Sequence, residues 1–491
     1  MRSACAHESD RQMSTLTGTR AFLHVLCLWL LPLTVPLSPS NISLTFLSER
    51  SIPFGWAQTG DKQALGGISA LDRDPCTGEY AMVSDHPNVM WRANITVEPS
   101  THSLGVNVGH AMPLRNGSRA LGDALDIEGL AFARLDECSG ANARMLLSTE
   151  RDKRGQQSRV LRFLADGRWA GPGTGLDTPA FYAGPRGDHI NLGFESLTVS
   201  PDGRRAYTAN ERPLERDRNH GGSRGRALLR VTQLAMSSGA AVRSVAYPLD
   251  ALAIAGAQDW GTGLSELVAL DDVGTLLAVE RSYSPTVGRN AVRLYTFSMQ
   301  GGADLLADPS CSESALNAHC TPVQKRLLLD VGASAAQLKN YEGACLGPRL
   351  SNGGLSILLV NDNNYNPKQG TTNFALFALH TNGAGLPIAA SPSAASRQRA
   401  GAVDDNGEQG DDDADVQNEG LQLSQFASLV CAVGVVWLGI ILLVMSRFQR
   451  RINAIPTTID IGNTEVVVQA TNVDDDNANY CGDIEERAML M

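Results

Sequence analysis

The sequence predicts an all-β fold, a β-propeller, from three observations. One segment pattern recurs five times: an apolar run with an acid or Ser near its start, a Gly-bearing turn, and a second apolar run that ends in a carboxylate. Two further apolar runs follow it in most units. Glycine is abundant (48 of 491 residues), and aromatic residues make up only 5%. Four short antiparallel strands per repeat are typical of one propeller blade.

Each copy of the pattern reads as a hairpin, and residues 193–212 (GFESLTVSPDGRRAYTANER) show it well, because an Asp-Gly turn separates two apolar runs. The copies span residues 66–86, 126–151, 193–212, 263–281 and 341–363. The polar residues near the first strand are Ser69, Glu128, Glu195, the pair Ser265 and Glu266, and Glu342. The carboxylates that end the second strand are Asp85, Glu150, Glu211, Glu280 and Asp362.

The remaining strands predict how the ring closes. Third strands are expected at residues 90–97, 159–164, 227–234, 291–298 and 374–380, and fourth strands at 242–249 and 325–331. The last unit has only three strands, and residues 42–50 resemble the missing one, so an N-terminal strand would complete the final blade. We count five blades, and a sixth is the alternative, since residues 104–122, 169–191 and 303–320 are long insertions. A β-sandwich is the rival fold, but it would not require acids at equivalent positions of five repeats.

Two apolar segments predict a type I single-pass membrane protein. Residues 1–40 read as a signal peptide with the segment before it, and an uncleaved signal anchor is the alternative. Residues 425–446 read as a transmembrane helix, because their uncharged core is about the ~20 residues that cross a bilayer. Arg447 and the next two Arg place the tail, residues 447–491, in the cytosol. The ectodomain, residues 41–385, would be extracellular or lumenal, at the plasma membrane or an endomembrane.

Charge separates the ectodomain from the rest of the chain. Residues 386–424 read as an acidic, disordered stalk, with eight acids and no base after residue 399. The tail holds eight acids and four Arg, so the net charge of −11 leaves +1 for residues 1–399. No large basic field marks the ectodomain, and we expect no nucleic-acid ligand.

Glycosylation and disulfide signals agree with export. Asn41, Asn94 and Asn116 each begin an Asn-X-Ser/Thr acceptor site and lie between the two apolar segments. Cys311 and Cys320 flank a short loop and are the expected disulfide. Pairing of Cys76 with Cys138 is left open, and Cys345 makes the ectodomain count odd.

The acids are expected to converge, because the innermost strand of every blade lines the central channel. Glu128, Glu195, Glu266 and Glu342 would face this channel, with the five acids that end the second strands as a further tier. Converging carboxylates bind hard cations, pair with Arg or share protons, so calcium is the expected cofactor. Arg151, Arg212 and Arg281 would donate to a substrate oxyanion. The alternative is that Glu–Arg pairs are inter-blade salt bridges.

The motifs D-x-E-G-L, G-x-E-S-L and Y-E-G-A, with distal S-T-E-R, A-N-E-R and V-N-D-N, resemble the phytase-like family described as esterase-like activity of phytase. The resemblance covers residues 66–379 and implies a repeat-built domain to which phosphoester hydrolysis is attributed from its acids. By position, it implies Glu128, Glu150, Glu195, Glu211, Glu280, Glu342 and Asp362. The first copy departs from the pattern at Ser69, and the fourth has Ser265 and Glu266 in swapped order.

The function expected from the sequence is a membrane-anchored, metal-assisted hydrolase that acts on a phosphorylated small molecule. The expected catalytic residues are Glu128, Glu195, Glu211 and Glu342. The expected metal ligands are Asp85, Glu150, Glu280 and Asp362. The alternative function is a non-catalytic cell-surface propeller that binds a protein or a glycan.

Overall fold

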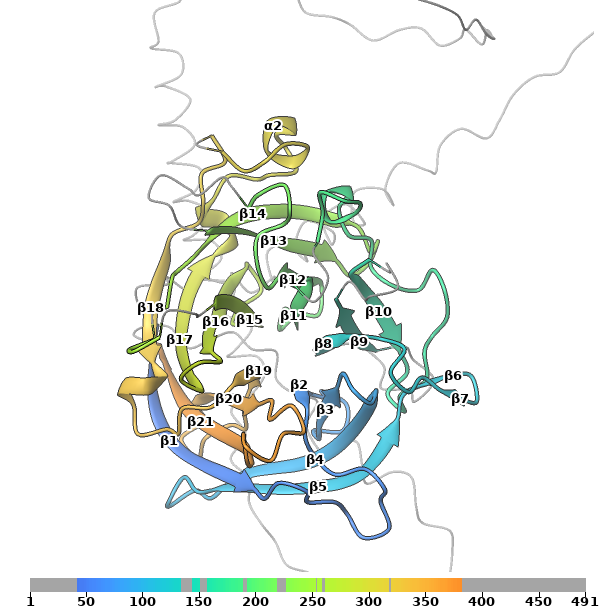
Figure 1. Cartoon of the computed structure of the whole chain (residues 1–491), viewed down its shortest axis with the longest axis vertical. Coiled ribbons are helices and arrows are strands. Elements are labelled where there is room, and N and C mark those ends of the chain that lie inside the picture. Colours follow the sequence, from blue (N-terminus) through green and yellow to red (C-terminus); the bar gives the residue numbers. More distant parts are fainter. Residues whose placement is uncertain are drawn as a thin grey trace, which may run out of the picture. The chain divides into compact units, whose positions relative to one another are not determined.

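The computed structural model describes residues 42–133, 144–150, 157–188, 192–218, 227–252, 254–257, 261–317 and 319–381. Five sheets are arranged around a central axis, so the predicted five-blade propeller is confirmed (Figure 1). The predicted signal peptide, Asn41, stalk, transmembrane helix and cytoplasmic tail lie outside the described residues. Among the residues that are described, no helix has the length and apolar character needed to span a bilayer.

The strands of each blade follow one another outward from the axis (Figure 1). Blade 1 holds β2 (Ile68–Arg73), β3 (Tyr80–Ser84), β4 (Val89–Val97) and β5 (Leu104–Pro113). Blade 2 holds β8 (Ile127–Phe132), β9 (Met145–Thr149) and β10 (Arg159–Phe163). Blade 3 holds β11 (Phe194–Val199), β12 (Arg205–Asn210), β13 (Ala227–Ala235) and β14 (Ala241–Leu249). Blade 4 holds β15 (Gly261–Ala269), β16 (Thr275–Ser284), β17 (Arg289–Ser298) and β18 (Lys325–Asp330).

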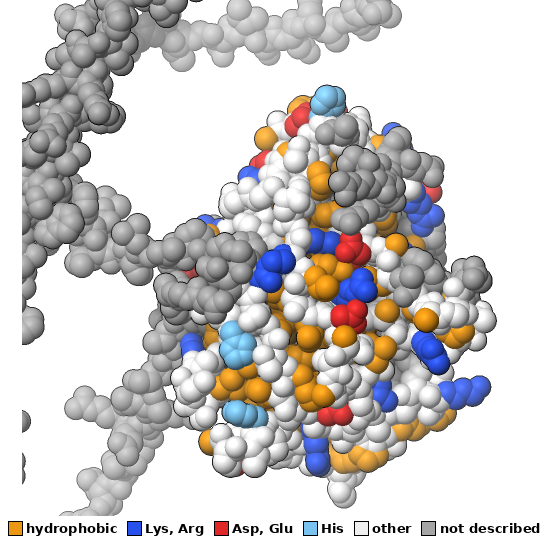
Figure 2. Space-filling model, turned by 90° about the vertical axis from the view of Figure 1, so that its left-hand side faces the viewer, with side chains coloured by type: hydrophobic (Ala, Val, Ile, Leu, Met, Phe, Trp, Pro, Cys, Tyr) orange, Lys and Arg blue, Asp and Glu red, His pale blue; other side chains and the backbone are white. Residues whose placement is uncertain are grey.

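Blade 5 closes the ring as the sequence predicts. It holds β19 (Tyr341–Leu346), β20 (Leu355–Asn361) and β21 (Thr372–Thr381), and the N-terminal strand β1 (Ile42–Ile52) is its outermost strand. β1 pairs antiparallel with β21 from Ile42 opposite Thr381 to Ile52 opposite Thr372. Figure 2 shows the flank where β1 and β18 lie outermost, with hydrophobic side chains gathered among charged ones. Pairing the first strand with the last covers the edge that β21 would otherwise expose.

The insertions do not form a sixth blade in the described part of the chain. Residues 104–122 contain β5, the outer strand of blade 1, and a two-stranded hairpin of β6 (Arg115–Asn116) and β7 (Arg119–Ala120). Trp169 and Leu176 form isolated bridges to Phe163 and Val160 and continue blade 2 outward. Residues 303–317, 319 and 320 belong to a loop that contains the short helix α2 (Pro309–Ser312).

The core of the propeller lies between neighbouring blades. Each of the five blade interfaces has its own cluster of buried apolar side chains, drawn from the facing strands of two blades. The largest buried side chain, Trp91 of β4, lies in the cluster between blades 5 and 1. Because blade faces pack on one another, the inner strands present their edges to the channel, where polar groups can meet.

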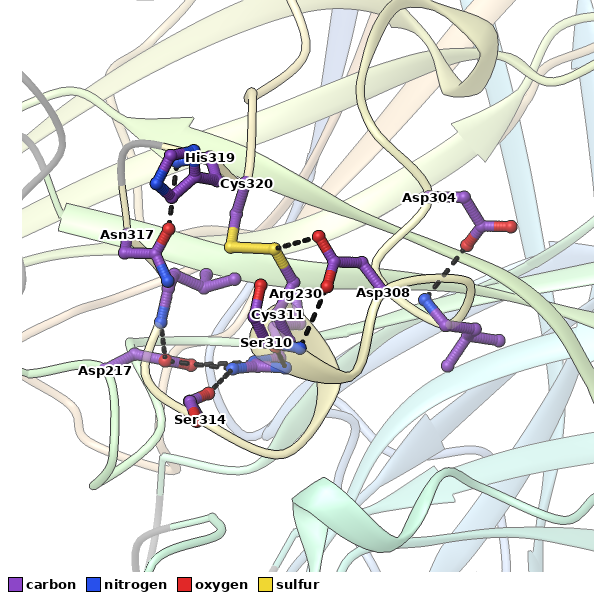
Figure 3. Close-up of a disulfide and its surroundings, with 12 residues drawn as sticks. Asp217, Arg230, Asp304, Asp308, Ser310, Cys311, Ser314, Asn317, His319 and Cys320 are labelled. Atoms are coloured by element: carbon purple, nitrogen blue, oxygen red, sulfur yellow. Dashed lines mark hydrogen bonds and ion pairs between the residues drawn. A yellow bond between two sulfur atoms is a disulfide. The ribbon is translucent and has the colours of Figure 1, made fainter.

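The disulfide loop is attached to blade 3 (Figure 3). The predicted bond between Cys311 and Cys320 is confirmed. The buried Arg230 guanidinium pairs with Asp217 and donates to the carbonyl oxygens of Cys311 and Ser314, 2.8 Å and 2.9 Å away. Asp217 also accepts the backbone N–H of Leu316. A single buried ion pair therefore holds the loop in place.

The other predicted modification sites are only partly described. The side chains of Asn94, on β4, and Asn116, on β6, are exposed, as glycan acceptors must be. Cys76 is disulfide-bonded, and Cys138 lies outside the described residues. Cys345 is buried and free.

Candidate functional site

A β-bulge at the same place in every inner strand begins the site. The pairing of β8 with β9 shifts between Ile127 and Gly129, so Glu128 has no partner residue on β9. Equivalent shifts leave Ser69, Glu195, Ser265 and Glu342 inside the other four bulges. A bulge redirects its extra side chain away from the sheet face, and such bulges are common beside functional sites. Three Glu and two Ser therefore occupy equivalent positions at one end of the channel.

A second set of equivalent positions lies at the end of the second strand of each blade. The residue before each bulge pairs with a residue of the second strand, and the next residue along that strand belongs to the set. These residues are, from blade 1 to blade 5, Asp85, Glu150, Glu211, Arg281 and Asp362. Backbone hydrogen bonds support this equivalence. The N–H groups of Glu150, Glu211 and Asp362 donate to the carbonyl oxygens of Asp126, Gly193 and Asn340, each two residues before its bulge, over 2.7–2.9 Å. Arg281 therefore occupies the position that four blades fill with an acid.

The structure does not bring Glu266 or Glu280 to this end of the channel. Glu266 follows the bulge, and its carboxylate accepts hydrogen bonds from the backbone N–H groups of Leu197 and Leu267, 3.0 Å and 2.9 Å away. Glu280 precedes the acid position, pairs with Lys325 and accepts the hydroxyl of Tyr247 at 2.7 Å. Neighbouring residues of a strand point to opposite faces, so an offset of one residue moved both side chains away. This corrects the expected placement of both.

Six acids and His86 form three overlapping groups, and neither Glu342 nor Asp362, an expected metal ligand, belongs to any of them among the described residues. Ligand oxygens of Glu150, Glu195 and Glu211 all lie within 4.8 Å of one another, and these residues are only 3–5% exposed. Ligand atoms of Asp126, Glu128 and Glu150 form a second group within the same distance. Those of Asp85, His86 and Asp126 form a third. We call Asp85, Asp126, Glu128, Glu150, Glu195 and Glu211 the acid cluster.

Asp126 and His86 belong to these groups, although neither is among the site residues expected from the sequence. Asp126 stands two residues before Glu128 in the D-x-E-G-L motif, and the alternation of a strand would have placed both carboxylates on one side. His86 follows Asp85 directly, and its Nδ1 lies 2.7 Å from the Asp85 Oδ2. Burial lowers the pKa of His86, but Asp85 and Asp126 raise it overall.

Arg281 supplies a fixed positive charge beside the acid cluster. Its Nη2 lies 2.8 Å from Glu342 Oε1 and 3.9 Å from Glu211 Oε1. Burial alone would lower the pKa of Arg281, but Glu342, Glu211 and Glu195 raise it overall. Among the described residues, its buried Nε has no hydrogen-bond partner. Arg281 thus compensates several carboxylates and still has a donor to offer a ligand.

Four carboxyl groups at this end of the channel hold protons more tightly than ordinary acids. Burial is the largest cause and raises the pKa values of Glu128, Glu150, Glu195 and Asp362 well above their usual range. Neighbouring carboxylates add to the rise; for Glu195 these are Glu211 and Glu150. Buried like charges at this range either share protons or are neutralised by a cation. Six acids with oxygen ligands suit a hard cation such as calcium.

Glycines of β15 make room for the neighbouring blade. A Cβ on Gly263 would lie 2.6 Å from Cγ of Glu211, and one on Gly261 would lie 2.5 Å from Nη2 of Arg212. A side chain at either position would force the facing Glu211 or Arg212 side chain to shift. Arg212 is partly exposed, with its Nε 3.8 Å from Glu211 Oε2, and Arg151 lies outside the described residues. Of the three predicted oxyanion donors, the structure places Arg281 and Arg212 beside Glu211.

Residues 63–365 match the model of the phytase-like family, which carries the description "Esterase-like activity of phytase". The chain belongs to the phytase-like family. This confirms the resemblance found in the sequence motifs. No curated protein matches this phytase-like chain.

Solved structures similar to the phytase-like chain include a tail fibre of Staphylococcus aureus phage P68, an endo-arabinase from Bacteroides thetaiotaomicron and a DUF4221 family member from Bacteroides vulgatus. Identities are 12%, 12% and 8%, with TM-scores of 0.33, 0.33 and 0.31. The matches cover 70%, 68% and 70% of this chain and 54%, 98% and 100% of theirs. The chain thus spans about half of the phage fibre, and at these TM-scores none of the three informs function.

Proposed function

We propose that this phytase-like protein is a divalent-cation-assisted phosphoester hydrolase whose site is the acid cluster at the channel end. The observation that supports this most is the group of Glu150, Glu195 and Glu211, buried with ligand oxygens within 4.8 Å of one another. Such a group is stable in its ionised form only when a cation neutralises it. Calcium takes carboxylate oxygens in flexible geometry, so it is the cation we propose.

Each residue of this site would have a separate role in the reaction. Glu150, Glu195 and Glu211 would hold the cation, which when bound polarises a phosphoryl oxygen. Arg281 would donate its free Nε–H to a second phosphoryl oxygen and orient the ester. Glu128 is partly exposed, and burial raises its pKa, so it is the group that would carry the transferable proton. That proton would pass to the leaving alcohol oxygen as water attacks phosphorus, giving orthophosphate and the alcohol.

We further propose that the propeller works outside the cell or in a lumen, anchored by residues 425–446, on a phosphorylated small molecule. The Cys311–Cys320 disulfide and the exposed Asn94 and Asn116 support an oxidising, glycosylating compartment. The basis for the anchor is the apolar run and the Arg residues after it.

The test uses the full-length protein in detergent, assayed for bound calcium by elemental analysis and for hydrolysis of a panel of phosphate monoesters and diesters. We expect chelation with EDTA to abolish turnover and calcium to restore it. The double variant Glu195→Gln, Glu211→Gln should lower turnover at least about tenfold, which is about 1.4 kcal/mol of activation free energy. The control Glu79→Gln changes an exposed acid in the β2–β3 turn, at the opposite end of its blade, and should leave turnover unchanged. An intact, inactive wild type across the whole panel contradicts the proposal.

A further inference from the structure

A cleft of about 890 Å³ lies between blades 4 and 5, next to the acid cluster. Its walls come from the β16–β17 connection, the segment before β19 and the β20–β21 connection. Its volume is within the roughly 300–1,000 Å³ of small-molecule sites. Arg281 and Glu342 line the side that adjoins the acid cluster. The cleft therefore has walls of its own, made by elements that hold none of the acid cluster.

The lining of the cleft is rich in side-chain amides, which are Asn290, Asn340, Asn361, Asn364, Asn366 and Gln369. Asn361 is buried and its amide bonds backbone groups, and the Asn364 amide donates to Gln369 Oε1, so the cleft offers a ligand the other amides and the remaining atoms of that pair. An amide carries both donors and an acceptor, as a hydroxyl group does, so amides pair with polyhydroxylated ligands. The apolar part of the lining includes Tyr283 and Leu338, two of the few large apolar side chains that are exposed in the described structure. An exposed Tyr ring beside polar groups suits the C–H face of a sugar ring.

The charge of the lining favours an anion. Lys339, Lys368 and Arg281 give three positive charges, against one negative charge from Glu342. Arg281 is already held by Glu342. In the part of the chain that the structure describes, neither the Lys339 nor the Lys368 ammonium group has a hydrogen-bond or ion-pair partner. The two lysines therefore carry the uncompensated charge of the cleft.

The loop that carries half of these groups is held in one strained conformation. Asn364 and Tyr365 have φ values of 52° and 46°, which non-glycine residues adopt at a cost. Asp362 Oδ1 accepts the N–H of Asn364 at 2.6 Å. The Tyr365 ring lies against blade 1, where a Cβ on Gly67 would lie 2.5 Å from its Cε2. Strain of this kind persists only where the surroundings hold it, so Asn366 and Lys368 project from a fixed loop.

We infer that this cleft is a binding site for an acidic saccharide. The carboxylate or sulfate of the sugar binds Lys339 and Lys368, its hydroxyl groups bind the amides, and its ring lies over Tyr283. A phosphorylated substrate would use the same lysines, but an amide lining of this extent recognises the hydroxyl groups of a sugar chain. This binding function goes beyond the proposed hydrolysis and does not depend on it.

Isothermal titration of the full-length protein in detergent tests the inference. The probes are a tetrasaccharide of alternating glucuronate and N-acetylglucosamine, a sulfated tetrasaccharide, the carboxyl-reduced neutral tetrasaccharide and inorganic phosphate. We expect at least one acidic tetrasaccharide to bind, and the neutral one to bind at least about tenfold more weakly, a difference of about 1.4 kcal/mol. The variant Lys339→Gln, Lys368→Gln should lose at least about tenfold in affinity. Arg204→Gln, an exposed base in the β11–β12 turn at the opposite end of blade 3, should lose nothing.

Two further outcomes decide between this site and the hydrolytic one. The variant Glu195→Gln, Glu211→Gln should keep its affinity for the acidic tetrasaccharide while it loses hydrolysis, so that either proposal can fail alone. The inference is overturned if neither acidic tetrasaccharide binds to protein that unfolds cooperatively. It is also overturned if the lysine variant binds as tightly as the wild type, or if inorganic phosphate binds as tightly as the tetrasaccharides, which would indicate a simple anion site.

Discussion

Arg281 Nη2 lies 2.8 Å from Glu342 Oε1, and Arg281 occupies the strand position that the other four blades fill with Asp or Glu. One blade thus contributes a positive charge where the others contribute a carboxylate. Since buried carboxylates repel one another, an internal cation lets the folded chain tolerate more of them. Arg281 also has an Nε without a partner among the described residues, which under the proposed function would donate to an oxyanion.

Replacing this counter-ion, Arg281→Gln, should make the stability of the protein depend on calcium. In EDTA, Glu342, Glu211 and Glu195 would face one another without compensation, and we expect a loss of about 3 kcal/mol, the lower end for breaking a buried pair. Calcium should recover most of this loss, because the variant lacks a positive charge that competes with the cation. Thermal unfolding with and without calcium measures both effects, with Arg204→Gln as the control. Equal melting temperatures in EDTA for Arg281→Gln and the wild type would refute the counter-ion role.

The raised pKa values predict a pH dependence of stability in EDTA. A carboxyl group whose pKa rises on folding binds its proton more tightly in the folded state. Its stabilising contribution is therefore complete below the ordinary pKa of 4.5 for Glu and is lost as the pH rises above it toward the folded value. We expect wild type to lose stability relative to Glu195→Gln over that rise, and calcium to remove the difference. If the difference in stability between the wild type and Glu195→Gln stays constant with pH, burial does not raise the pKa of Glu195.

The buried pair of Asp217 and Arg230 should matter far more than an exposed pair of the same length. Both side chains are 0% exposed, and Asp217→Asn would leave Arg230 buried without its counter-charge, at a cost of about 3–5 kcal/mol. The Arg293–Asp330 pair has the same 2.8 Å distance with side chains 39% and 36% exposed, so Asp330→Asn should cost less than about 1 kcal/mol. Urea unfolding compares the two. Similar losses would mean that the disulfide loop, not the ion pair, holds this part of blade 3.

The closing strand β1 should be needed for the whole ring. Leu44 is buried and faces the apolar cluster between blades 4 and 5, whereas its neighbour Ser43 is exposed. Leu44→Asp would bury a charge in that cluster and should cost about 3 kcal/mol or more. Ser43→Asp, one residue away on the outer face, should cost little. A single unfolding transition that shifts only for Leu44→Asp would show that the blades unfold together, and two separate transitions would show that they do not.

Much of the fold could be predicted from the sequence, because its signals are local. The five hairpins, the third strands and the closing segment at residues 42–50 show in alternation and turn residues, which depend on neighbours a few positions away. The outer strand β5 lies in a segment that the sequence predicts as an insertion, because Gly and polar residues interrupt its apolar pattern. The short loop between Cys311 and Cys320 was enough to predict their disulfide.

The sequence by itself determined that five similar hairpins carry acids and that their ring closes through the N-terminal strand. Only the tertiary structure decided which acids meet. A bulge adds one residue to each inner strand, and one residue is enough to turn a side chain to the opposite face. Glu280 and Arg281 resemble Glu211 and Arg212 in sequence, but the pairing of the strands sets them one position out of phase. The residue before the bulge pairs with Asn210 in blade 3 and with Glu280 in blade 4, so Arg281 takes the place of the acid.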